Sequence, residues 1–424
     1  MEGLRIHTID HFDYKNKTVI LRVDINSPID PVTKQIVNTN RIDKSLPTIV
    51  DLVEKGAKIV LLAHQGDTLD YQNLGPLSEH AQLLTERLGR EVRYIDDVAG
   101  PAAIEAVKEL QAGEIILLGN LRYLCEEVST FENAVPLKPE EMLDTYLIRH
   151  LAPLADYYVN DAFAAAHRNA PSMVAFQELL PSAGGRQLIA EFGALHKVAA
   201  DPERPAVFVL GGLKVSDAFG MIRQVLEQGT ADRILAGGVL GILFQMAGGL
   251  SFGPTQEQFL RDRNLLGFVK QAQDYLADFP DHFVCPVDFA YQDGEQRVEA
   301  HINELPQNRL FTDIGSQSIE RFKAEIAKAG TIFINGPMGA YENPLLSLGT
   351  DSIWNAMAEA PGYTVVGGGD SVSAAYRFVK DPEENFDYIC TAGGAMVRFL
   401  SGSELPLIKA LRKAYGRHMD EKGA

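Results

Sequence analysis

The amino-acid sequence predicts an α/β protein built on parallel sheets, and three observations lead to that class. Short, almost continuous apolar runs rich in Val and Ile recur along the chain, which is typical of strands buried on both faces. Stretches with apolar residues at helical spacing lie between these runs. No repeat of roughly 20 to 50 residues is visible, which argues against a solenoid or a propeller. The alternation of strand and helix therefore favours parallel sheets covered by helices.

These patterns place the elements along the chain. We expect strands at residues 18–23, 58–62, 114–118, 157–159, 206–210, 331–334 and 363–366. We expect helices at residues 42–55, 78–88, 186–198, 216–227, 316–328 and 405–415. The polar segment 291–308 is interpreted as an irregular surface excursion, and the alternating Lys and Arg of the last helix as a solvated face.

A domain boundary is expected near residues 185–204. Gly184-Gly185 precedes an expected helix there, and a charged segment with two prolines follows it at residues 201–205. The length of 424 residues corresponds to two or three domains of roughly 150 residues each. Because 27 of the 37 glycines lie beyond residue 190, the two halves are expected to bind their ligands with different chemistry.

Composition disfavours several classes of function. The 39 Lys and Arg residues against 57 Asp and Glu residues give a net charge of −18, which repels nucleic acid and anionic membranes. The three cysteines form no Cys-x-x-Cys pair, and the longest apolar stretch, 239–247, is shorter than the ~20 residues of a membrane span. Residues 1–13 lack the apolar core of a signal peptide. We expect a cytoplasmic monomer that binds small molecules, with any anion held by local Arg or Lys.

Ionic and polar residues follow the expected strands of the first half. In open parallel sheets ligands bind at the carboxyl ends of the strands, so these positions are candidate site residues. They are, strand by strand, Asp24 and Asn26; His64, Gln65, Gly66 and Asp67; Asn120 and Arg122; and Asn160, Asp161, His167 and Arg168. Arginine binds carboxylate or phosphate through two parallel hydrogen bonds, so the set predicts a small-anion site. The alternative is that each residue lies on the surface or belongs to an internal ion pair.

Glycines take the equivalent positions in the second half. They are Gly211-Gly212, Gly237-Gly238, Gly367-Gly368-Gly369 and Gly393-Gly394. Glycine lets main-chain N–H groups approach a ligand, and a helix that starts there points its positive end at it, which suits a phosphate or a nucleotide. Turns also need glycine, which is the simpler explanation for any single pair. Neither a Walker loop nor a Gly-x-Gly-x-x-Gly fingerprint is present.

Two side chains stand out against these glycines. Lys214, before a helix that Ser216 would cap, places a flexible cation beside a bound phosphate. Asp370 is suited to Mg²⁺, which takes few carboxylates when phosphates supply the other oxygens. Each residue alone would more often be a cap or a surface residue. An anion site on one half and an oligophosphate site on the other describe a kinase, in which Arg41 and Lys214 would stabilise the transferred group.

Longer blocks of residues occur in order along the chain. They include Arg22-Val23-Asp24-Ile25-Asn26, Asn120-Leu121-Arg122-Tyr123, Val159-Asn160-Asp161-Ala162-Phe163, Gly211-Gly212-Leu213-Lys214, Asn335-Gly336-Pro337-Met338-Gly339 and Gly367-Gly368-Gly369-Asp370-Ser371. In their identity and order these blocks resemble the phosphoglycerate kinase family along nearly the entire chain.

The resemblance implies two Rossmann-like, three-layer α/β domains with parallel sheets. Residues 1–185 would bind the acid, 186–204 would form a hinge helix and linker, 205–404 would bind the nucleotide, and the tail 405–424 would pack back on the first domain. It also implies reversible transfer of the γ-phosphoryl group of ATP, with Mg²⁺, to the carboxylate of 3-phosphoglycerate or a related acid. The product would be an acyl phosphate and ADP.

The resemblance further implies a role for each matched residue. The acid would contact Asp24, Asn26, Arg41, His64, Gly66, Asp67, Arg122 and Arg168. The nucleotide would contact Gly212, Lys214, Gly237, Gly238, Gly315, Asn335, Glu342, Gly367, Gly368, Gly369, Asp370 and Ser371. Asp370 would hold the metal, and Arg41 and Lys214 would flank the moving phosphoryl group as catalytic residues. Hinge closure would expel water from the reacting groups.

The chain departs from the family pattern at several positions. Asp67 stands where the family has an arginine for the substrate phosphate, and Ala218 where it has a second lysine. Ala170, Ser316 and Ala392 replace a histidine, a proline and a glycine, which are milder changes. A catalytically silent member that binds nucleotide or acid for regulation or assembly is therefore the alternative to an active kinase. A dehydrogenase on the same architecture is disfavoured by the missing dinucleotide fingerprint.

The acid at position 67 leads to the first testable prediction. Placing a carboxylate beside the substrate phosphate costs several kcal/mol, so Asp67→Arg is expected to lower the KM for 3-phosphoglycerate by at least about tenfold. Steady-state kinetics with ATP held at saturation measure the change. An unchanged KM would mean that the loop does not lie where the family places it.

Overall fold

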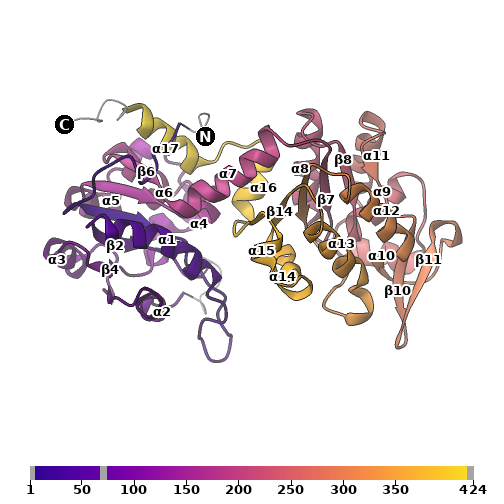
Figure 1. Ribbon diagram of the computed structural model, residues 1–424, viewed down its shortest axis with the longest axis horizontal. Helices are drawn as coiled ribbons and strands as arrows, with labels where there is room; N and C mark the ends of the chain where they lie inside the picture. The colour runs from indigo at the N-terminus through magenta and orange to yellow at the C-terminus, as the bar shows by residue number, and fades with distance from the viewer. Residues whose placement is uncertain (1–4, 67–73, 418–424) are drawn as a thin grey trace. The chain divides into compact units, whose positions relative to one another are not determined.

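The computed structural model describes residues 5–66 and 74–417, and the chain divides into two compact units. The first unit comprises residues 1–193 and 404–424, and the second comprises residues 194–403. Each unit contains a six-stranded sheet with helices packed against it (Figure 1). The two parallel sheets confirm the predicted α/β class.

The sheet of the first unit has the order β3-β4-β2-β1-β5-β6, and all neighbouring strands are parallel. Its strands are β1 (Thr18–Arg22), β2 (Lys58–Leu62), β3 (Val92–Tyr94), β4 (Ile115–Leu117), β5 (Tyr157–Asn160) and β6 (Ser182–Gly184). All five residues of β1 are buried, as the continuous apolar run predicted. Because the strands are parallel, their carboxyl ends lie at one edge of the sheet.

Helices cover both faces of this sheet. They are α1 (Asn40–Glu54), α2 (Ser78–Leu88), α3 (Pro101–Glu109), α4 (Ser129–Ala134), α5 (Tyr146–Leu151), α6 (Pro171–Val174), the start of α7 (Arg186–Ala200) and α17 (Pro406–Arg417). Val19 and Leu21 of β1 pack in one cluster with Ile49 of α1 and Leu84 of α2. Tyr158 is buried in β5 and stacks on Phe176.

The basic residues of the last helix, α17, are exposed, as predicted, while its other face is buried. Leu407 and Leu411 are buried, and the helix contacts α6 and β6. Two of its basic residues are engaged by one carboxylate of the first unit: Lys413 lies 3.0 Å and Arg417 2.8 Å from Glu178. The pattern of basic residues therefore marks ion pairs as well as solvent contact.

The sheet of the second unit has the order β15-β14-β13-β7-β8-β9, again with parallel neighbours. Its strands are β7 (Ala206–Leu210), β8 (Arg233–Ala236), β9 (Phe283–Val284), β13 (Thr331–Asn335), β14 (Tyr363–Gly367) and β15 (Tyr388–Ile389). From β7 the chain builds outward through β8 and β9, then returns to place β13 on the other side of β7. The carboxyl ends of β7 and β13 therefore form the switch point at which such sheets bind ligands.

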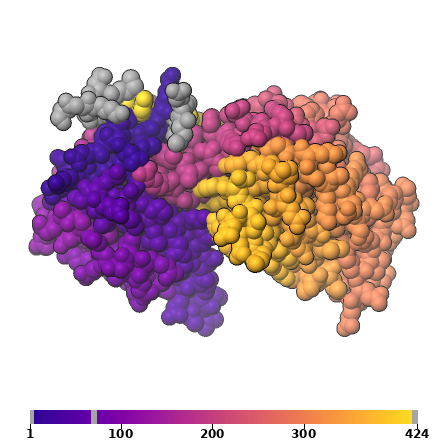
Figure 2. Space-filling view, viewed as in Figure 1, coloured from indigo at the N-terminus to yellow at the C-terminus, as the bar shows by residue number. Residues whose placement is uncertain are grey.

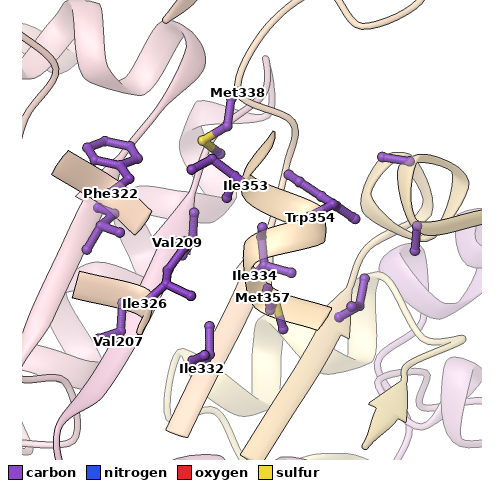
Figure 3. Close-up of a cluster of buried hydrophobic side chains, with 14 of the residues drawn as sticks. Val207, Val209, Phe322, Ile326, Ile332, Ile334, Met338, Ile353, Trp354 and Met357 are labelled. Atoms are coloured by element: carbon purple, nitrogen blue, oxygen red, sulfur yellow. The ribbon is translucent and has the colours of Figure 1, made fainter. Parts of the chain in front are cut away.

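Helices and a buried core fix this second sheet. The helices are α8 (Val215–Glu227), α9 (Gly238–Ala247), α10 (Pro254–Asp262), α11 (Phe268–Asp278), α12 (Ser316–Ile326), α13 (Leu348–Ala358), α14 (Gly369–Phe378), α15 (Pro382–Asn385) and α16 (Gly394–Leu400). Figure 3 shows Phe322 of α12 and Trp354 of α13 beside Val209 and Ile334 of the sheet. The alternate strand residue Phe208 is equally buried.

A small antiparallel sheet in the second unit was not predicted. It consists of β10 (Asp288–Asp293), β11 (Gln296–His301) and β12 (Phe311–Ile314), in the order β11-β10-β12. The β10–β11 hairpin projects from its unit (Figures 1 and 2) and occupies much of the segment 291–308, so the prediction of an irregular excursion was wrong. Two of its central residues, Val298 and Glu299, are only half-buried, because the polar outer face of a hairpin needs no apolar run.

Most other predicted elements agree with the structure within two residues at either end. The expected cap at Ser216 was wrong, because α8 already starts at Val215 and Lys214 takes the cap position without a side-chain hydrogen bond. No helix in residues 5–66 and 74–417 is both long and apolar enough to cross a membrane.

The core of the second unit leads to a stability prediction. Phe322 is completely buried, so Phe322→Ala is expected to lower the free energy of unfolding by about 3–5 kcal/mol. Trp354, the single tryptophan of the chain, lies in the same cluster and reports the transition by fluorescence during urea unfolding. Lys323, whose side chain is 39% exposed on the same helix, supplies the control, and Lys323→Ala should shift stability by less than about 0.5 kcal/mol. Equal effects of the two changes would contradict the packing assignment.

Candidate active site

The strand ends of the first unit bring the predicted anion-binding residues to one edge of the sheet. Asp24 follows β1 and His64 follows β2, and the register pairs Arg22 at the end of β1 with Leu62 at the end of β2. Arg122 lies in η2 (Leu121–Tyr123), the short 3-10 helix after β4. The parallel register therefore places the predicted residues together without any long-range loop.

A buried hydrogen bond joins the two central strands at this edge. Nη2 of Arg22 lies 2.8 Å from Nδ1 of His64, and both side chains are buried. Nε of Arg22 donates to Oγ of Ser172 at 3.4 Å. Arg22 was not among the predicted residues, because it ends an apolar run instead of following one. In the sequence, Arg22 is distinguished only as a charged residue within an apolar run that predicts a strand.

His64 is held in its neutral form. Burial is the largest cause of a pKa well below the usual value, and the charge of Arg22 is the next. Arg122 and Arg41 lower the pKa further, against the opposing effect of Asp24. Three guanidinium groups therefore act together against protonation of the imidazole.

Arg41 and Asp24 form an ion pair beside this centre. Nη1 of Arg41 lies 3.1 Å from Oδ2 of Asp24, and the backbone N–H of Asn26 donates to the same carboxylate at 3.1 Å. Burial alone would raise the pKa of Asp24, but the charges of Arg41 and Arg22 and the backbone N–H of Asn26 outweigh it and the pKa is lowered. The backbone N–H of Gly66 donates to Oδ1 of Asn26 at 3.0 Å, which ties the two strand-end loops together.

The remaining predicted residues of the first unit have different surroundings. Nε of Arg168 donates to Oε2 of Glu132 at 2.7 Å, so this arginine has a carboxylate partner within its own unit. The backbone N–H of Arg122 donates to Oδ1 of Asn120 at 3.0 Å. Asp67 lies outside the residues that the structure describes.

A buried carboxylate, that of Glu127, is linked to Arg22 through Ser172. Glu127 accepts hydrogen bonds from the backbone N–H and the hydroxyl of Ser172, at 2.7 and 2.6 Å. Burial raises the pKa of Glu127 to about 7, against the lowering effect of those hydrogen bonds. The sequence block after Arg122 contains Glu127, but nothing in the pattern shows that it lies beneath the site.

In the second unit, some of the predicted glycines line two adjoining cavities. The larger, of about 440 Å³, and the smaller, of about 160 Å³, share Gly212, Leu213 and Asp370 as lining residues. Of the other predicted residues, Gly238 and Glu342 line the larger cavity, and Lys214, Asn335, Gly368 and Gly369 line the smaller. The starts of α8 and α14 meet at the smaller cavity, so their positive ends favour an anion there.

Lys214 and Asp370 face each other at this site. Nζ of Lys214 lies 3.7 Å from Oδ2 of Asp370, and their side chains are 73% and 62% exposed. An ion pair so exposed contributes only about 0–1 kcal/mol, so both groups can exchange partners at little cost. The residues fit a magnesium–phosphate complex, because Mg²⁺ needs only one or two carboxylates when phosphates complete its shell. The described residues include no cluster of three or more His, Cys, Asp or Glu that would hold a metal by itself.

Several predicted glycines serve packing and do not line either cavity. A Cβ atom at Gly237 would meet Met338, one at Gly315 would meet Asp288, and one at Gly367 would meet Met396. Gly369 is different, because no atom lies within 4 Å of a Cβ placed there, so it leaves room for a ligand.

Ser371, like these glycines, does not line either cavity. It is completely buried, and its hydroxyl accepts a hydrogen bond from the backbone N–H of Gly336 at 2.7 Å. Its backbone oxygen accepts one from Nε1 of Trp354 at 3.1 Å. Ser371 therefore holds the loop after β13 in place.

Apolar side chains that the sequence did not single out form the larger cavity. They are Leu213, Val239, Ile242, Phe259, Phe311 and Tyr341. Apolar walls with a few polar groups are typical of sites for planar organic ligands such as a nucleotide base. Apolar side chains at helical spacing give no separate sequence signal, since any core helix shows the same pattern.

Comparison with known proteins assigns this arrangement to one family. The family model described as phosphoglycerate kinase matches residues 9–403. Phosphoglycerate kinase of Methanothermobacter thermautotrophicus is 38% identical over 412 residues, covering 97% of this chain and 98% of the relative. That of Thermococcus kodakarensis is 40% identical over 422 residues, covering 97% and 98%. The crystal structure of phosphoglycerate kinase from Pyrococcus horikoshii OT3 superposes with a TM-score of 0.87 at 36% identity, covering 97% of this chain and 100% of that one.

Burial of Glu127 predicts a specific pH dependence of stability. Its pKa is raised from 4.5 to about 7 in the folded chain, so the folded state binds the proton more tightly, and this stabilisation is lost as the pH rises through about 7. Glu127→Gln cannot ionise, so its free energy of unfolding relative to the parent chain should rise by about 3 kcal/mol between pH 5 and pH 8. Urea unfolding followed by circular dichroism measures the difference. A difference that does not change with pH would contradict the assignment.

Proposed function

The chain belongs to the phosphoglycerate kinase family, and from that premise we propose how its residues bind the two substrates and transfer the phosphoryl group. Its activity is that of a phosphoglycerate kinase, a phosphotransferase with a carboxyl group as acceptor in a family of glycolytic enzymes. Members of the family bind 3-phosphoglycerate and use ATP or ADP with Mg²⁺. Extending these ligands to particular residues of this chain is our proposal.

The acid is proposed to bind at the strand ends of the first unit. The observation that carries this proposal is the buried hydrogen bond between Arg22 and His64, at 2.8 Å, beside the ion pair of Arg41 with Asp24 at 3.1 Å. The charges of Arg41 and Arg122 also act on His64. In a chain of net charge −18, such a concentration of guanidinium groups is what an anion needs. We propose contacts from Asp24, Asn26, Arg41, His64, Gly66, Asp67, Arg122 and Arg168.

The nucleotide is proposed to bind in the two cavities of the second unit. The base would lie in the apolar larger cavity with Glu342 toward the ribose, and the phosphates would lie in the smaller cavity near Lys214, Asn335 and the N–H groups at Gly368 and Gly369. Gly212 and Gly238 would also contact the nucleotide. We assign supporting roles to Gly237, Gly315, Gly367 and Ser371, which lie behind the cavity walls.

We propose that Asp370 holds the magnesium ion. Bound Mg²⁺ would neutralise charge on the phosphates and so assist transfer. The exposed position of the Asp370 carboxylate at both cavities, beside Lys214, supports this role.

Arg41 and Lys214 are proposed as the catalytic residues. Phosphoryl transfer needs little covalent help from the protein, so alignment and positive charge around the transferred group supply most of the rate. The pairing of Arg41 with Asp24 orients its guanidinium before the acid binds. Retention of Arg41, Lys214 and Asp370 favours an active enzyme over a catalytically silent member.

The architecture also supports proposals that concern the whole chain. We propose that residues 186–204, which include α7, act as the hinge and linker between the acid-binding residues 1–185 and the nucleotide-binding residues 205–404, with 405–424 as a tail on the first domain. We also propose a cytoplasmic, monomeric enzyme. Light scattering on the purified chain tests the oligomeric state against the mass of 46.5 kDa.

Removal of Lys214 tests the catalytic assignment. Its ammonium group is expected to stabilise charge that develops during transfer, so Lys214→Ala should lower kcat by about 10² to 10³ with the fold unchanged. A coupled assay with 3-phosphoglycerate and MgATP measures turnover, and circular dichroism checks the fold.

Lys380 supplies the matched control for this prediction. Its side chain is 94% exposed on the same unit, so Lys380→Ala should retain full turnover. Full turnover in Lys214→Ala would refute its role. Absence of turnover in the parent chain with any acid, together with tight nucleotide binding, would favour the silent alternative.

A further inference from the structure

We propose that Glu132 is a positioning residue for acid binding: it fixes the guanidinium of Arg168 so that the Nη1 and Nη2 groups are presented to the anionic group of the substrate. The inference rests on the proposed role of Arg168 in the acid site. It assigns a function to α4, a short helix with no buried residue that the fold itself does not need for its core.

Glu132 is held by two donors from consecutive residues. Its Oε2 accepts from Nε of Arg168 at 2.7 Å, and its Oε1 accepts from the backbone N–H of Asn169 at 2.8 Å. Nδ2 of Asn169 donates in turn to the backbone oxygen of Leu137, just after α4, at 2.8 Å. The carboxylate is thus attached both to the Arg168 side chain and to the backbone beside it, so the guanidinium cannot turn without breaking a charge-assisted hydrogen bond.

Glu132 engages Nε of Arg168 and leaves Nη1 and Nη2 available to a ligand. Within residues 5–66 and 74–417, Nε is the only nitrogen of the Arg168 side chain that has a hydrogen-bond partner. A planar guanidinium has five N–H donors in a fixed fork, and the edge formed by Nη1 and Nη2 is well suited to a phosphate or carboxylate. A partner at Nε alone therefore orients the side chain and leaves its binding edge open.

Arg168 lies four residues before Ser172, whose hydroxyl accepts a hydrogen bond from Nε of Arg22 at 3.4 Å. Arg22 has a lowered pKa, chiefly because it is buried, and the charge of Arg168 contributes to the lowering. Arg22 is the residue that is hydrogen-bonded to His64. Arg168 therefore lies near the same centre on which Arg41 and Arg122 act.

Partial burial makes this pair suitable for positioning. The side chains of Arg168 and Glu132 are 17% and 19% exposed, so water screens their attraction less than it screens a surface pair. Repulsion from Arg22 would otherwise displace a long, flexible arginine from the site. With Glu132 present, the Arg168 side chain is already ordered before the substrate binds, so its ordering adds no entropy cost to binding.

Steady-state kinetics of the full chain test the proposal. Glu132→Ala is expected to raise the KM for 3-phosphoglycerate about tenfold, with kcat and the KM for MgATP within about twofold of the parent values. Glu132→Gln keeps a carbonyl oxygen that accepts from Nε, so its KM for 3-phosphoglycerate should stay within about threefold. A purely structural role would instead lower the fraction of active enzyme, and so kcat, without a selective change in this KM. An unchanged KM in Glu132→Ala overturns the proposal.

Variants of Arg168 separate this inference from the proposed function. Arg168→Ala should raise the KM for 3-phosphoglycerate, and adding Glu132→Ala to it should cause no further rise, because Glu132 acts through Arg168. A raised KM in Arg168→Ala with an unchanged one in Glu132→Ala overturns only the positioning role. An unchanged KM in Arg168→Ala overturns the acid-site assignment of this arginine and the inference with it.

Two further variants control for nonspecific effects of losing a carboxylate and for a failure of Glu132→Ala to fold. Asp156→Ala removes a carboxylate from another ion pair of the first unit, with Lys17 at 3.3 Å, at the opposite end of the sheet, and should leave both KM values unchanged. If Glu132→Ala fails to fold, Glu132→Asp keeps the charge but is one methylene shorter. It should raise the KM for 3-phosphoglycerate if positioning is needed, and an unchanged KM would again overturn the proposal.

Discussion

The acid-binding side of this enzyme depends on a guanidinium buried beneath the strand ends. Arg22 is only 3% exposed, and a buried charge is strongly destabilising unless hydrogen bonds and opposite charge compensate it. His64 and Ser172 supply the hydrogen bonds, and Asp24 contributes opposite charge through its effect on Arg22. A permanent cation is thus maintained below a neutral imidazole. The strand ends therefore carry a fixed positive charge before any substrate binds, although the chain as a whole is strongly acidic.

The second unit also has to attract an anion, and there backbone N–H groups take the place of arginine side chains. At the switch point between β7 and β13, the backbone N–H of Gly211 donates to the oxygen of Asn335 at 2.9 Å, and that of Gly212 to the oxygen of Pro337 at 2.8 Å. This close approach leaves no space for a side chain at Gly211, where a Cβ atom would meet the oxygen of Pro337. Many of the glycines are therefore required by the packing of the two loops. Exposure of N–H groups and helix ends to phosphate follows from that packing.

The sequence predicts those features that depend on local pattern, and misses those that depend on contacts between distant segments. Continuous apolar runs located β2 and β7 at their observed bounds, because strands buried on both faces have no polar interruption. The β10–β11 hairpin was missed because its outer face is polar. The residues after the strands were recognised as site candidates by topology alone. Arg22 and Glu132 were not, because their importance arises from partners such as His64 and Arg168 that lie 42 and 36 residues away.

The ion pairs of the two sites differ in solvent exposure, and exposure decides how easily a side chain can exchange its partner. Lys214 and Asp370 are 73% and 62% exposed at a separation of 3.7 Å, so their attraction is weak and each can turn to a phosphate or a metal. Arg168 and Glu132 are below 20% exposed at 2.7 Å, where screening is weaker and the hydrogen bond is charge-assisted. Lys214 is therefore able to give up its partner during turnover, whereas Arg168 keeps its own. The Arg41–Asp24 pair, whose side chains are 33% and 9% exposed, is also sheltered, so Arg41 would act on the transferred group while its guanidinium is held in place.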